Sequence, residues 1–157
     1  MKINIQIIFI QSKKIKPFEA VDEMYLDKIS AFCDIELVVV KSEEAERKNK
    51  EIKKQKETEK ILQKIRPDDY VILCDEGGQN LTSEKFATTL MTQLETYKCV
   101  TFVIGGAFGV TEELKSRAQW SINLSPFVLN HHIAKIVLAE QIYRAFTIAK
   151  NIPYHNE

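Results

Sequence analysis

Apolar residues along this chain recur at two different spacings, and the two spacings alternate. Five short runs are apolar or β-branched and predict strands, whereas the segments between them repeat apolar residues every three or four positions and predict helices. The predicted strands are residues 2–9, 35–40, 70–74, 99–104 and 120–124. The predicted helices are one that Pro17 opens, then residues 42–65, 82–97, a short helix after Thr111, and residues 131–150. This order predicts an α/β fold with a mainly parallel sheet and helices on both faces.

Two of the predicted helices depart from the usual amphipathic pattern. Residues 42–65 are highly charged and have almost no apolar face before Ile61, so we expect the first half of this helix to be solvated. Residues 131–150 are apolar around nearly the whole circumference, which indicates burial on most sides. One face can pack on the sheet, and a partner subunit would cover the other. We therefore expect a homodimer, with a fully buried central helix as the alternative.

The composition is typical of a globular cytoplasmic protein. The 157 residues are 45% hydrophobic and 28% charged, and no linker or repeat divides them, so we expect one domain over residues 1–157. Cys33, Cys74 and Cys99 show no CxxC spacing, which favours reduced thiols over a disulfide or a zinc site. No run approaches the roughly 18 apolar residues of a membrane span, and polar residues interrupt the apolar start, which predicts a strand and not a signal peptide.

Charge is unevenly distributed although the formal net charge is +0. Residues 41–64 carry nine Lys or Arg against six Asp or Glu, and residues 115–157 carry five against two. Residues 66–114 carry three against eight. A protein that binds free nucleic acid by charge alone is usually basic overall. An RNA partner would therefore be held by a local patch or within a larger assembly.

Three glycines follow the predicted strand 99–104 directly, at Gly105, Gly106 and Gly109. Glycines beyond the carboxyl end of a buried strand let the backbone approach a ligand, because no Cβ stands in the way. Their spacing is GGxxG and not GxGxxG, so the dinucleotide-binding fingerprint is absent. A tight turn between a strand and a helix, without any ligand, is the alternative.

A second irregular segment precedes the last helix. It consists of Leu124, Ser125, Pro126, Phe127, Val128 and Leu129. Apolar loops of this kind can wrap an adenine and supply backbone hydrogen bonds to its edge. An ordinary connection between a strand and a helix is the alternative.

Two adjacent histidines, His131 and His132, stand at the predicted start of the last helix. Adjacent helical residues point about 100° apart, so two neighbours rarely ligate one metal ion. No carboxylate or cysteine lies at ligand spacing from them, and we expect no metal site. His131 can still contact a ligand anion, or it can simply pack.

Polar and aromatic residues near the carboxyl end are further candidates. Glu140 and Arg144 are four residues apart, which suits an ion pair on one helix face. The functional alternative is an arginine that contacts a phosphate or a base edge. Tyr154 and His155 lie where chains usually fray, but an aromatic ring beside an imidazole can also stack on a base and bind phosphate.

Taken in order, five segments resemble one family. They are Ile-Gly-Gly-x-x-Gly at 104–109, Leu-Ser-x-x-x-Leu at 124–129, His131, Glu140-x-x-Tyr143-Arg144-Ala145, and Pro153-Tyr154-His155. In these segments the chain resembles the small SPOUT-class RNA methyltransferases. Within that class it is most similar to the ribosomal RNA large subunit methyltransferase H family, which methylates N3 of a pseudouridine in 23S rRNA. The likeness covers the full length and is most specific in the C-terminal third.

The resemblance implies a fold, a reaction and a set of site residues. The fold would be an α/β domain with a C-terminal trefoil knot, paired as a homodimer, and the methyl donor would be S-adenosyl-L-methionine. The cofactor walls would be Cys74, Gly105 and each residue of the loop 124–129. The candidates that face the pseudouridine are His131, Arg144, Tyr154 and His155, with His155 as first choice for the proton acceptor. Zero net charge favours a substrate presented by assembled ribosomes.

Three residues differ from the family's usual pattern. Asn130 stands where a proline is common before the histidine, and Lys135 stands where an arginine is frequent. Pro126 has no N–H to donate to a cofactor. Two other functions stay open: a nucleotide-binding hydrolase, which would lack its phosphate-loop or triad signature here, and a non-catalytic ribosome-binding protein, which is favoured if the Asn130–Lys135 region has lost the cofactor.

Overall fold

Five parallel strands form one sheet in the order β2-β1-β4-β3-β5 in the computed structural model, which describes residues 4–42 and 49–156. The strands are β1 Asn4–Gln11, β2 Asp34–Lys41, β3 Tyr70–Asn80, β4 Cys99–Ile104 and β5 Trp120–Asn123. The helices are α1 Lys16–Ser30, α2 Lys50–Lys64, α3 Ser83–Thr96, α4 Glu112–Arg117 and α5 His131–Ala149. The α/β fold and its parallel sheet are confirmed, and the fifth strand is present.

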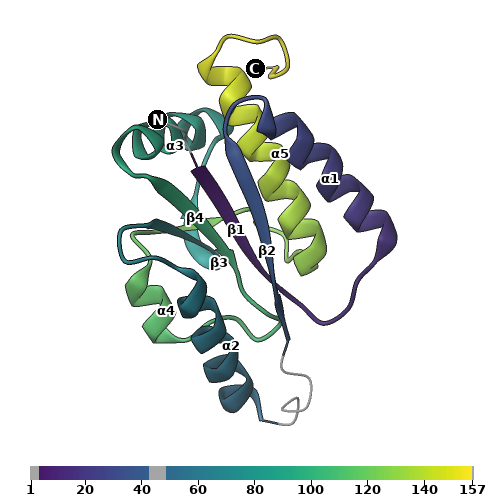
Figure 1. Cartoon of the computed structure of the whole chain (residues 1–157), viewed down its shortest axis with the longest axis vertical. Helices are drawn as coiled ribbons and strands as arrows, with labels where there is room; N and C mark the ends of the chain where they lie inside the picture. The colour runs from purple at the N-terminus through teal and green to yellow at the C-terminus, as the bar shows by residue number, and fades with distance from the viewer. Residues whose placement is uncertain (1–3, 43–48, 157) are drawn as a thin grey trace.

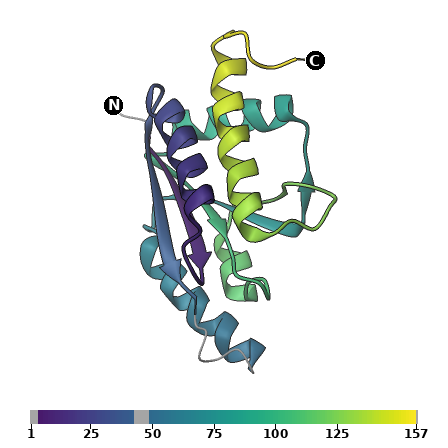
Figure 2. The same ribbon diagram turned by 90° about the vertical axis from the view of Figure 1, so that its right-hand side faces the viewer.

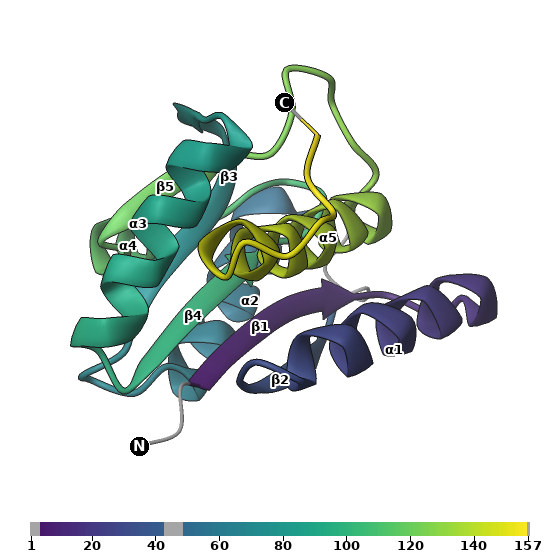
Figure 3. The ribbon, with the colours of Figure 1, turned by 90° about the horizontal axis from the view of Figure 1, so that it is seen from above.

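Helices cover both faces of the sheet. Side chains of successive strand residues point to opposite faces, so each central strand contributes to two cores. In β1, Ile5, Ile7 and Phe9 pack into the larger core with α1, α3 and α5, whereas Ile8 and Ile10 pack into a smaller core with α2 and α4. Figure 3 shows α5 between α3 and α1 on the larger-core side, and Figure 1 shows α2 next to α4. Seen from the side in Figure 2, α5 runs the length of the sheet.

Helix starts follow the capping residues in the sequence. Thr82 accepts a hydrogen bond from the backbone N–H of Lys85 at 3.2 Å, and Thr111 accepts one from Leu114 at 3.4 Å. Such side chains satisfy N–H groups that the first turn of a helix leaves without a partner. Both helix starts predicted from the sequence are therefore confirmed.

Strand β3 is longer than predicted. The sequence Asp75-Glu76-Gly77-Gly78 was expected to close the strand after Cys74, yet β3 continues to Asn80. Cys74 and Gln79 both pair with Ile122 of β5, so the residues between them leave the ladder as a large bulge and pairing then resumes. Gly78 is required there, because a Cβ would stand 2.5 Å from the carbonyl carbon of Ile122.

The charged helix differs from its prediction in both its start and its burial. Among the described residues it begins at Lys50 and not at Ser42, and residues 43–48 lie outside the described part of the chain. Its first half is not simply solvated, since Lys53 is only 5% exposed and Glu57 only 3%. The predicted solvation holds at residues 49–52, which are exposed, but it is wrong at Lys53, because charged side chains can be buried as a pair.

Helix α5 is buried on one side and partly open on the other. Leu138 and Ile142 are fully buried, whereas Ile133 is 42% exposed and Ile136 and Val137 are half-buried. A fully buried central helix is thus contradicted, and the homodimer stays a prediction. No helix in residues 4–42 and 49–156 has the length and apolar character that a membrane span requires. The trefoil knot also stays a prediction.

Candidate functional site

A pocket of about 540 Å³ opens at the carboxyl ends of β3 and β4. Seven of the eight predicted cofactor residues line it: Cys74, Gly105, Leu124, Ser125, Phe127, Val128 and Leu129. Pro126 is not among the lining residues, while His131 is. Segments from three distant parts of the sequence therefore converge on one cavity, at the sheet edge where α/β folds bind ligands.

The glycine-containing turn forms one wall of this pocket. Gly109 has a φ of 81°, and its N–H donates to the Gly106 carbonyl at 3.0 Å, which folds residues 105–109 tightly. A Cβ at Gly105 would lie 2.5 Å from Cγ1 of Val110. Because these positions lack side chains, bare backbone faces the cavity.

The loop 124–129 forms the opposite wall and is held by local hydrogen bonds. Ser125 donates its N–H to Asn123 Oδ1 at 3.3 Å, and the Ser125 hydroxyl accepts the N–H of Phe127 at 3.0 Å. The side chains of Phe127 and Val128 are 82% and 79% exposed. Large apolar groups held this far into solvent indicate a surface that a ligand or another chain covers.

The bulge in β3 adds two carboxylates that sequence reasoning missed. Asp75 and Glu76 both line the pocket. Burial, with the nearby Asp75 carboxylate, raises the pKa of the Cys74 thiol to about 12, so this cysteine is a neutral wall group. The sequence did offer a signal for them, because two acidic residues follow directly after the predicted strand 70–74. They were overlooked because the strand was expected to end at Cys74.

His131 and His132 have different surroundings. His131 lines the pocket, and its ring centroid lies 5.3 Å from that of Phe9. His132 is 3% exposed and stacks on Phe18 at 5.2 Å. Burial lowers the pKa of both histidines, with Lys135 contributing to each, so both are neutral near pH 7. In the described ranges, no three His, Cys, Asp or Glu side chains come together as a metal site.

The other candidate catalytic residues form a separate cluster at the far end of α5. Arg144 Nε donates to Glu140 Oε1 at 3.0 Å, and the Tyr154 hydroxyl donates to the same oxygen at 3.1 Å. Arg144 Nη1 lies 3.0 Å from Nδ1 of His155, whose Nε2 lies 2.6 Å from Glu84 Oε1. The C-terminal tail is thus fixed on α5 and α3 and is not frayed.

The hydrogen bonds of this cluster define its protonation. Because a guanidinium only donates, His155 must accept at Nδ1 and carry its proton on Nε2, which donates to Glu84. Partial burial and the Glu140 carboxylate raise the pKa of Tyr154 to about 12. The guanidinium of Arg144 also lies 4.7 Å from the centre of the Tyr154 ring. The cluster therefore offers one cation, one phenol and one imidazole whose Nδ1 accepts from Arg144.

Within one chain, the cluster and the pocket are far apart. Arg144 lies thirteen residues after His131 on α5, which corresponds to about 20 Å along the helix. Figure 2 shows α5 running from the green loop that borders the pocket to the yellow C-terminal tail. The structure brings Arg144, Tyr154 and His155 together, but it does not bring them to His131.

Known proteins resemble this chain over nearly its whole length. The family model described as "Predicted SPOUT methyltransferase" matches residues 1–155. The chain belongs to the SPOUT methyltransferase family. The resemblance noted in the sequence is therefore confirmed at the level of the family, and the parallel α/β sheet is consistent with the SPOUT fold.

Individual relatives within this family cover most of the chain. A protein of Bdellovibrio bacteriovorus is 45% identical over 139 residues, covering 88% of this chain and 89% of the relative. A protein of Exiguobacterium sp. is 39% identical, and one of Christiangramia forsetii is 33% identical, each covering 98% of this chain and 99% of the relative. All three are named "Ribosomal RNA large subunit methyltransferase H".

Two of the residues that differ from the usual SPOUT pattern have structural partners here. Asn130 caps α5, since its Oδ1 accepts the N–H of His132 at 2.9 Å. Lys135 is 3% exposed; its Nζ lies 2.7 Å from Asp22 Oδ2 and 4.2 Å from the centre of the Phe9 ring. Lys135 therefore ties α5 to α1 and does not line the pocket.

Proposed function

We propose that this chain transfers a methyl group from S-adenosyl-L-methionine to N3 of a pseudouridine in 23S rRNA. The observation that carries the proposal is the pocket of about 540 Å³ between the glycine-containing turn and the loop 124–129, in a chain that matches the SPOUT family over residues 1–155. The names of the relatives support a ribosomal RNA substrate. A cytoplasmic location follows from that substrate.

The residues present fit such a cofactor. The cavity lies within the range of roughly 300–1,000 Å³ that small-molecule sites occupy. Leu124 and Leu129 would pack against the adenine, while the bare backbone at Gly105 allows a close approach. Asp75 and Glu76 supply carboxylates for hydroxyl or ammonium groups. When bound, the cofactor supplies an electrophilic methyl group on a sulfonium.

The remaining residues would handle the pyrimidine base. Arg144 can donate to an imide oxygen, where negative charge develops as the N3 proton leaves, or to a neighbouring phosphate. Tyr154 would position the base by stacking or by its hydroxyl. His155 would accept the imide proton, but only after its Nδ1 separates from Arg144, because that lone pair is engaged.

A homodimer would bring the two separate parts together. The partly open face of α5 carries Ile133, Ile136 and Val137, and the exposed Phe127 and Val128 lie on the loop before it. A two-fold axis perpendicular to α5 pairs the two copies of this helix antiparallel. In that arrangement the cluster around Arg144 of one chain approaches the pocket of the other.

Assembled ribosomes would be the substrate, because the chain has no net charge with which to attract free RNA over a distance. A local basic surface is available on α2, where Lys50, Lys56 and Lys64 are exposed. We expect methylation of an isolated hairpin to be much slower than methylation of ribosomes. Comparable rates would contradict this part of the proposal.

Two measurements test the function. Titration calorimetry with S-adenosyl-L-methionine should show binding, and mass mapping of nucleosides after incubation with ribosomes should locate one new methyl group on a pseudouridine of 23S rRNA. Binding to ribosomes without cofactor binding would instead establish the non-catalytic ribosome-binding protein. A methyl group at another base would keep the reaction class but exclude the proposed nucleotide.

A further inference from the structure

A buried ion pair lies directly beneath the glycine-containing turn. Lys53 and Glu57 are 5% and 3% exposed, although both belong to the highly charged α2. Lys53 Nζ lies 2.8 Å from Glu57 Oε2, and the Ser42 hydroxyl donates to the same oxygen at 2.9 Å. Burial of two charges is unfavourable unless good geometry and further hydrogen bonds compensate for it. A contribution to folding stability is therefore a weak explanation for the presence of this buried ion pair.

The other carboxylate oxygen of Glu57 faces the turn. A Cβ at Gly106 would stand 2.6 Å from Glu57 Oε1 and 3.4 Å from its Cδ. A real Cβ does not come this close, so Gly106 is needed to let the carboxylate and the backbone meet. Gly106 also lines the pocket. Only the thickness of the turn separates Glu57 from the cofactor side.

Helix α2 contacts the same segment at two further points. The Thr111 hydroxyl donates to the Thr58 hydroxyl at 3.0 Å, and Thr58 is 1% exposed. Lys50 Nζ lies 5.1 Å from the ring centre of Phe108, within the range of a cation–π contact. Contacts at Gly106, Phe108 and Thr111 span the whole turn. The helix therefore supports the segment from behind along its length.

We propose that Glu57, oriented by Lys53 and Ser42, is a positioning residue that fixes the backbone at Gly106 and thereby the shape of the cofactor pocket. Glu57 acts through the turn and does not itself touch the reacting groups. This inference rests on the proposed function, since S-adenosyl-L-methionine is the ligand used to test it.

Loss of only one partner is a poor test, because an unpaired charge left in the interior can prevent folding. The main variant is therefore Lys53→Met/Glu57→Leu, which removes both charges and keeps similar volume. Its matched control is Glu59→Gln, a neutralised carboxylate on the exposed side of the same helix. Three quantities are measured: the urea unfolding midpoint, the Kd for S-adenosyl-L-methionine, and hydrogen exchange of the amides at 105–110.

A positioning role predicts that the double variant unfolds near the wild-type midpoint, binds the cofactor about tenfold or more weakly, and exchanges faster at 105–110. The control should differ from wild type by less than about twofold in Kd. A double variant with wild-type Kd and exchange would overturn the proposal and leave the pair a merely structural feature. If wild type fails to bind the cofactor, the proposed function fails, and the exchange measurement still decides the inference.

A second measurement tests the contact itself. Gly106→Ala should weaken cofactor binding about tenfold in the wild-type background, because its Cβ meets Glu57 Oε1. In a Lys53→Met/Glu57→Ala background, which leaves no unpaired charge in the interior, the same substitution should cost about threefold or less, since the opposing carboxylate is gone. Equal losses in the two backgrounds would overturn the proposed contact.

Discussion

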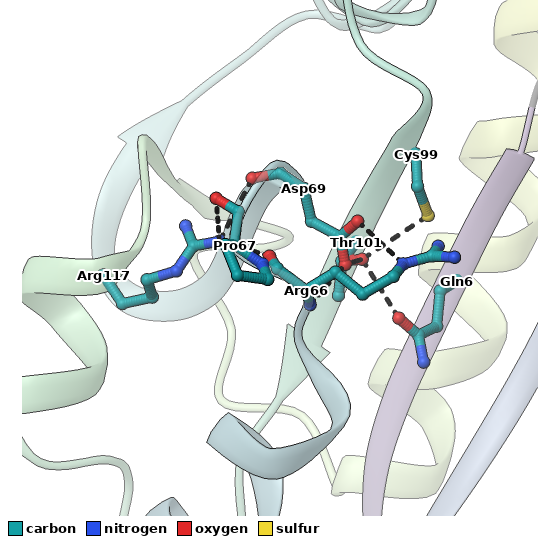
Figure 4. Close-up of polar contacts among 7 residues, drawn as sticks. All are labelled: Gln6, Arg66, Pro67, Asp69, Cys99, Thr101 and Arg117. Carbon is teal, nitrogen blue, oxygen red and sulfur yellow. Dashed lines mark hydrogen bonds and ion pairs between the residues drawn. The ribbon is translucent and has the colours of Figure 1, made fainter.

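A buried carboxylate lies at each end of the parallel strands, and the two have different neighbours. Asp69 lies at the amino ends, called the amino edge here, and Glu57 lies at the carboxyl ends, called the carboxyl edge. At the amino edge, Asp69 accepts from the Arg66 backbone N–H at 3.0 Å, from Arg66 Nε at 3.2 Å and from the Thr101 hydroxyl at 3.1 Å (Figure 4). At the carboxyl edge, Glu57 shares one oxygen with Lys53 and Ser42 and directs the other toward Gly106. Both oxygens of Asp69 accept hydrogen bonds from residues around the start of β3 and β4, whereas Glu57 supports a turn that lines the pocket.

This difference separates a structural network from a functional one. Around Asp69, Arg117 Nη2 also donates to the carbonyls of Arg66 and Asp69 at 2.9 Å and 3.2 Å (Figure 4). These hydrogen bonds fix the backbone directly before β3. Arg66, Asp69 and Arg117 are not among the residues that line the pocket of about 540 Å³. A buried charge alone is thus a poor guide to function, and the segment that the charged group faces is the better guide.

The largest effect is expected at the amino edge. Asp69→Ala leaves the Arg66 N–H without its acceptor, removes one of the two acceptors of the Thr101 hydroxyl (the other is Gln6 Oε1), and should lower the free energy of unfolding by about 3 kcal/mol. Cofactor affinity at a temperature where the variant is folded should stay within about twofold of wild type. Urea unfolding and calorimetry measure the two quantities.

The neighbouring Asp68 is the control for that substitution, because it is exposed. Asp68→Ala should change the free energy of unfolding by no more than about 0.5 kcal/mol. A tenfold loss of cofactor affinity in folded Asp69→Ala would break the comparison, since it would connect the amino edge to the pocket.

The second prediction concerns the cluster at the end of α5. Arg144→Lys should lower the methylation rate on ribosomes about 100-fold, because an ammonium does not reproduce the planar donors of a guanidinium. The Kd for S-adenosyl-L-methionine should be unchanged, since Arg144 does not line the cofactor pocket and is proposed to contact the base or a phosphate of the RNA. Single-turnover kinetics and calorimetry separate these effects. Weaker cofactor binding with an unaltered rate would refute this assignment.

Much of the fold follows from local pattern. The strand β4 is a continuous apolar run bounded by Gly105, and the caps Thr82 and Thr111 mark where helices begin. These features depend on residues that are neighbours in sequence, so the sequence predicts them. The pocket walls were also predicted, because the spacing of glycines and the loop 124–129 both stand directly after strands.

The remaining features depend on contacts between distant segments. The spacing of four residues brings Lys53 to Glu57, but the burial of Glu57 also requires Ser42 and Gly106, and no spacing rule encodes those contacts. The bulge in β3 depends on pairing with Ile122 of a strand more than forty residues later. The distance between Arg144 and the pocket depends on the length and direction of α5. The sequence pattern therefore named candidate residues but did not show which of them lie together within one chain.

The third prediction returns to the carboxyl edge. Gly105→Ala places a Cβ 2.5 Å from Cγ1 of Val110, so the turn or the Val110 side chain, both of which line the pocket, must shift. We expect a loss of about tenfold in cofactor affinity with a smaller loss, about 1 kcal/mol, in the free energy of unfolding. Asp69→Ala is expected to do the reverse, with a large loss of stability and little loss of cofactor affinity. Calorimetry and urea unfolding measure the two quantities for both variants. A large loss of stability with normal cofactor affinity would remove the distinction between the two edges.

The smallest effect concerns His132, the buried neighbour of the pocket-lining His131. Burial and Lys135 lower the pKa of His132 below its ordinary 6.5, so the unfolded chain binds a proton here more readily than the folded chain. Stability is therefore lost as pH falls below about 6.5 and is kept above it. Nδ1 of His132 has no hydrogen-bond partner among residues 4–42 and 49–156, which makes a ring of similar shape acceptable.

His132→Phe should flatten this dependence, so that the fall in unfolding free energy between pH 7 and pH 5 is smaller than in wild type by about 0.5–1 kcal/mol. Asp22, whose pKa burial raises, contributes with the opposite sign in both proteins and largely cancels in the difference. Lys150→Ala, at an exposed residue, should keep the wild-type slope. An unchanged slope in His132→Phe would mean that His132 takes up its proton without opening the packing against Phe18. The carboxyl edge would then tolerate a charge that its burial argues against.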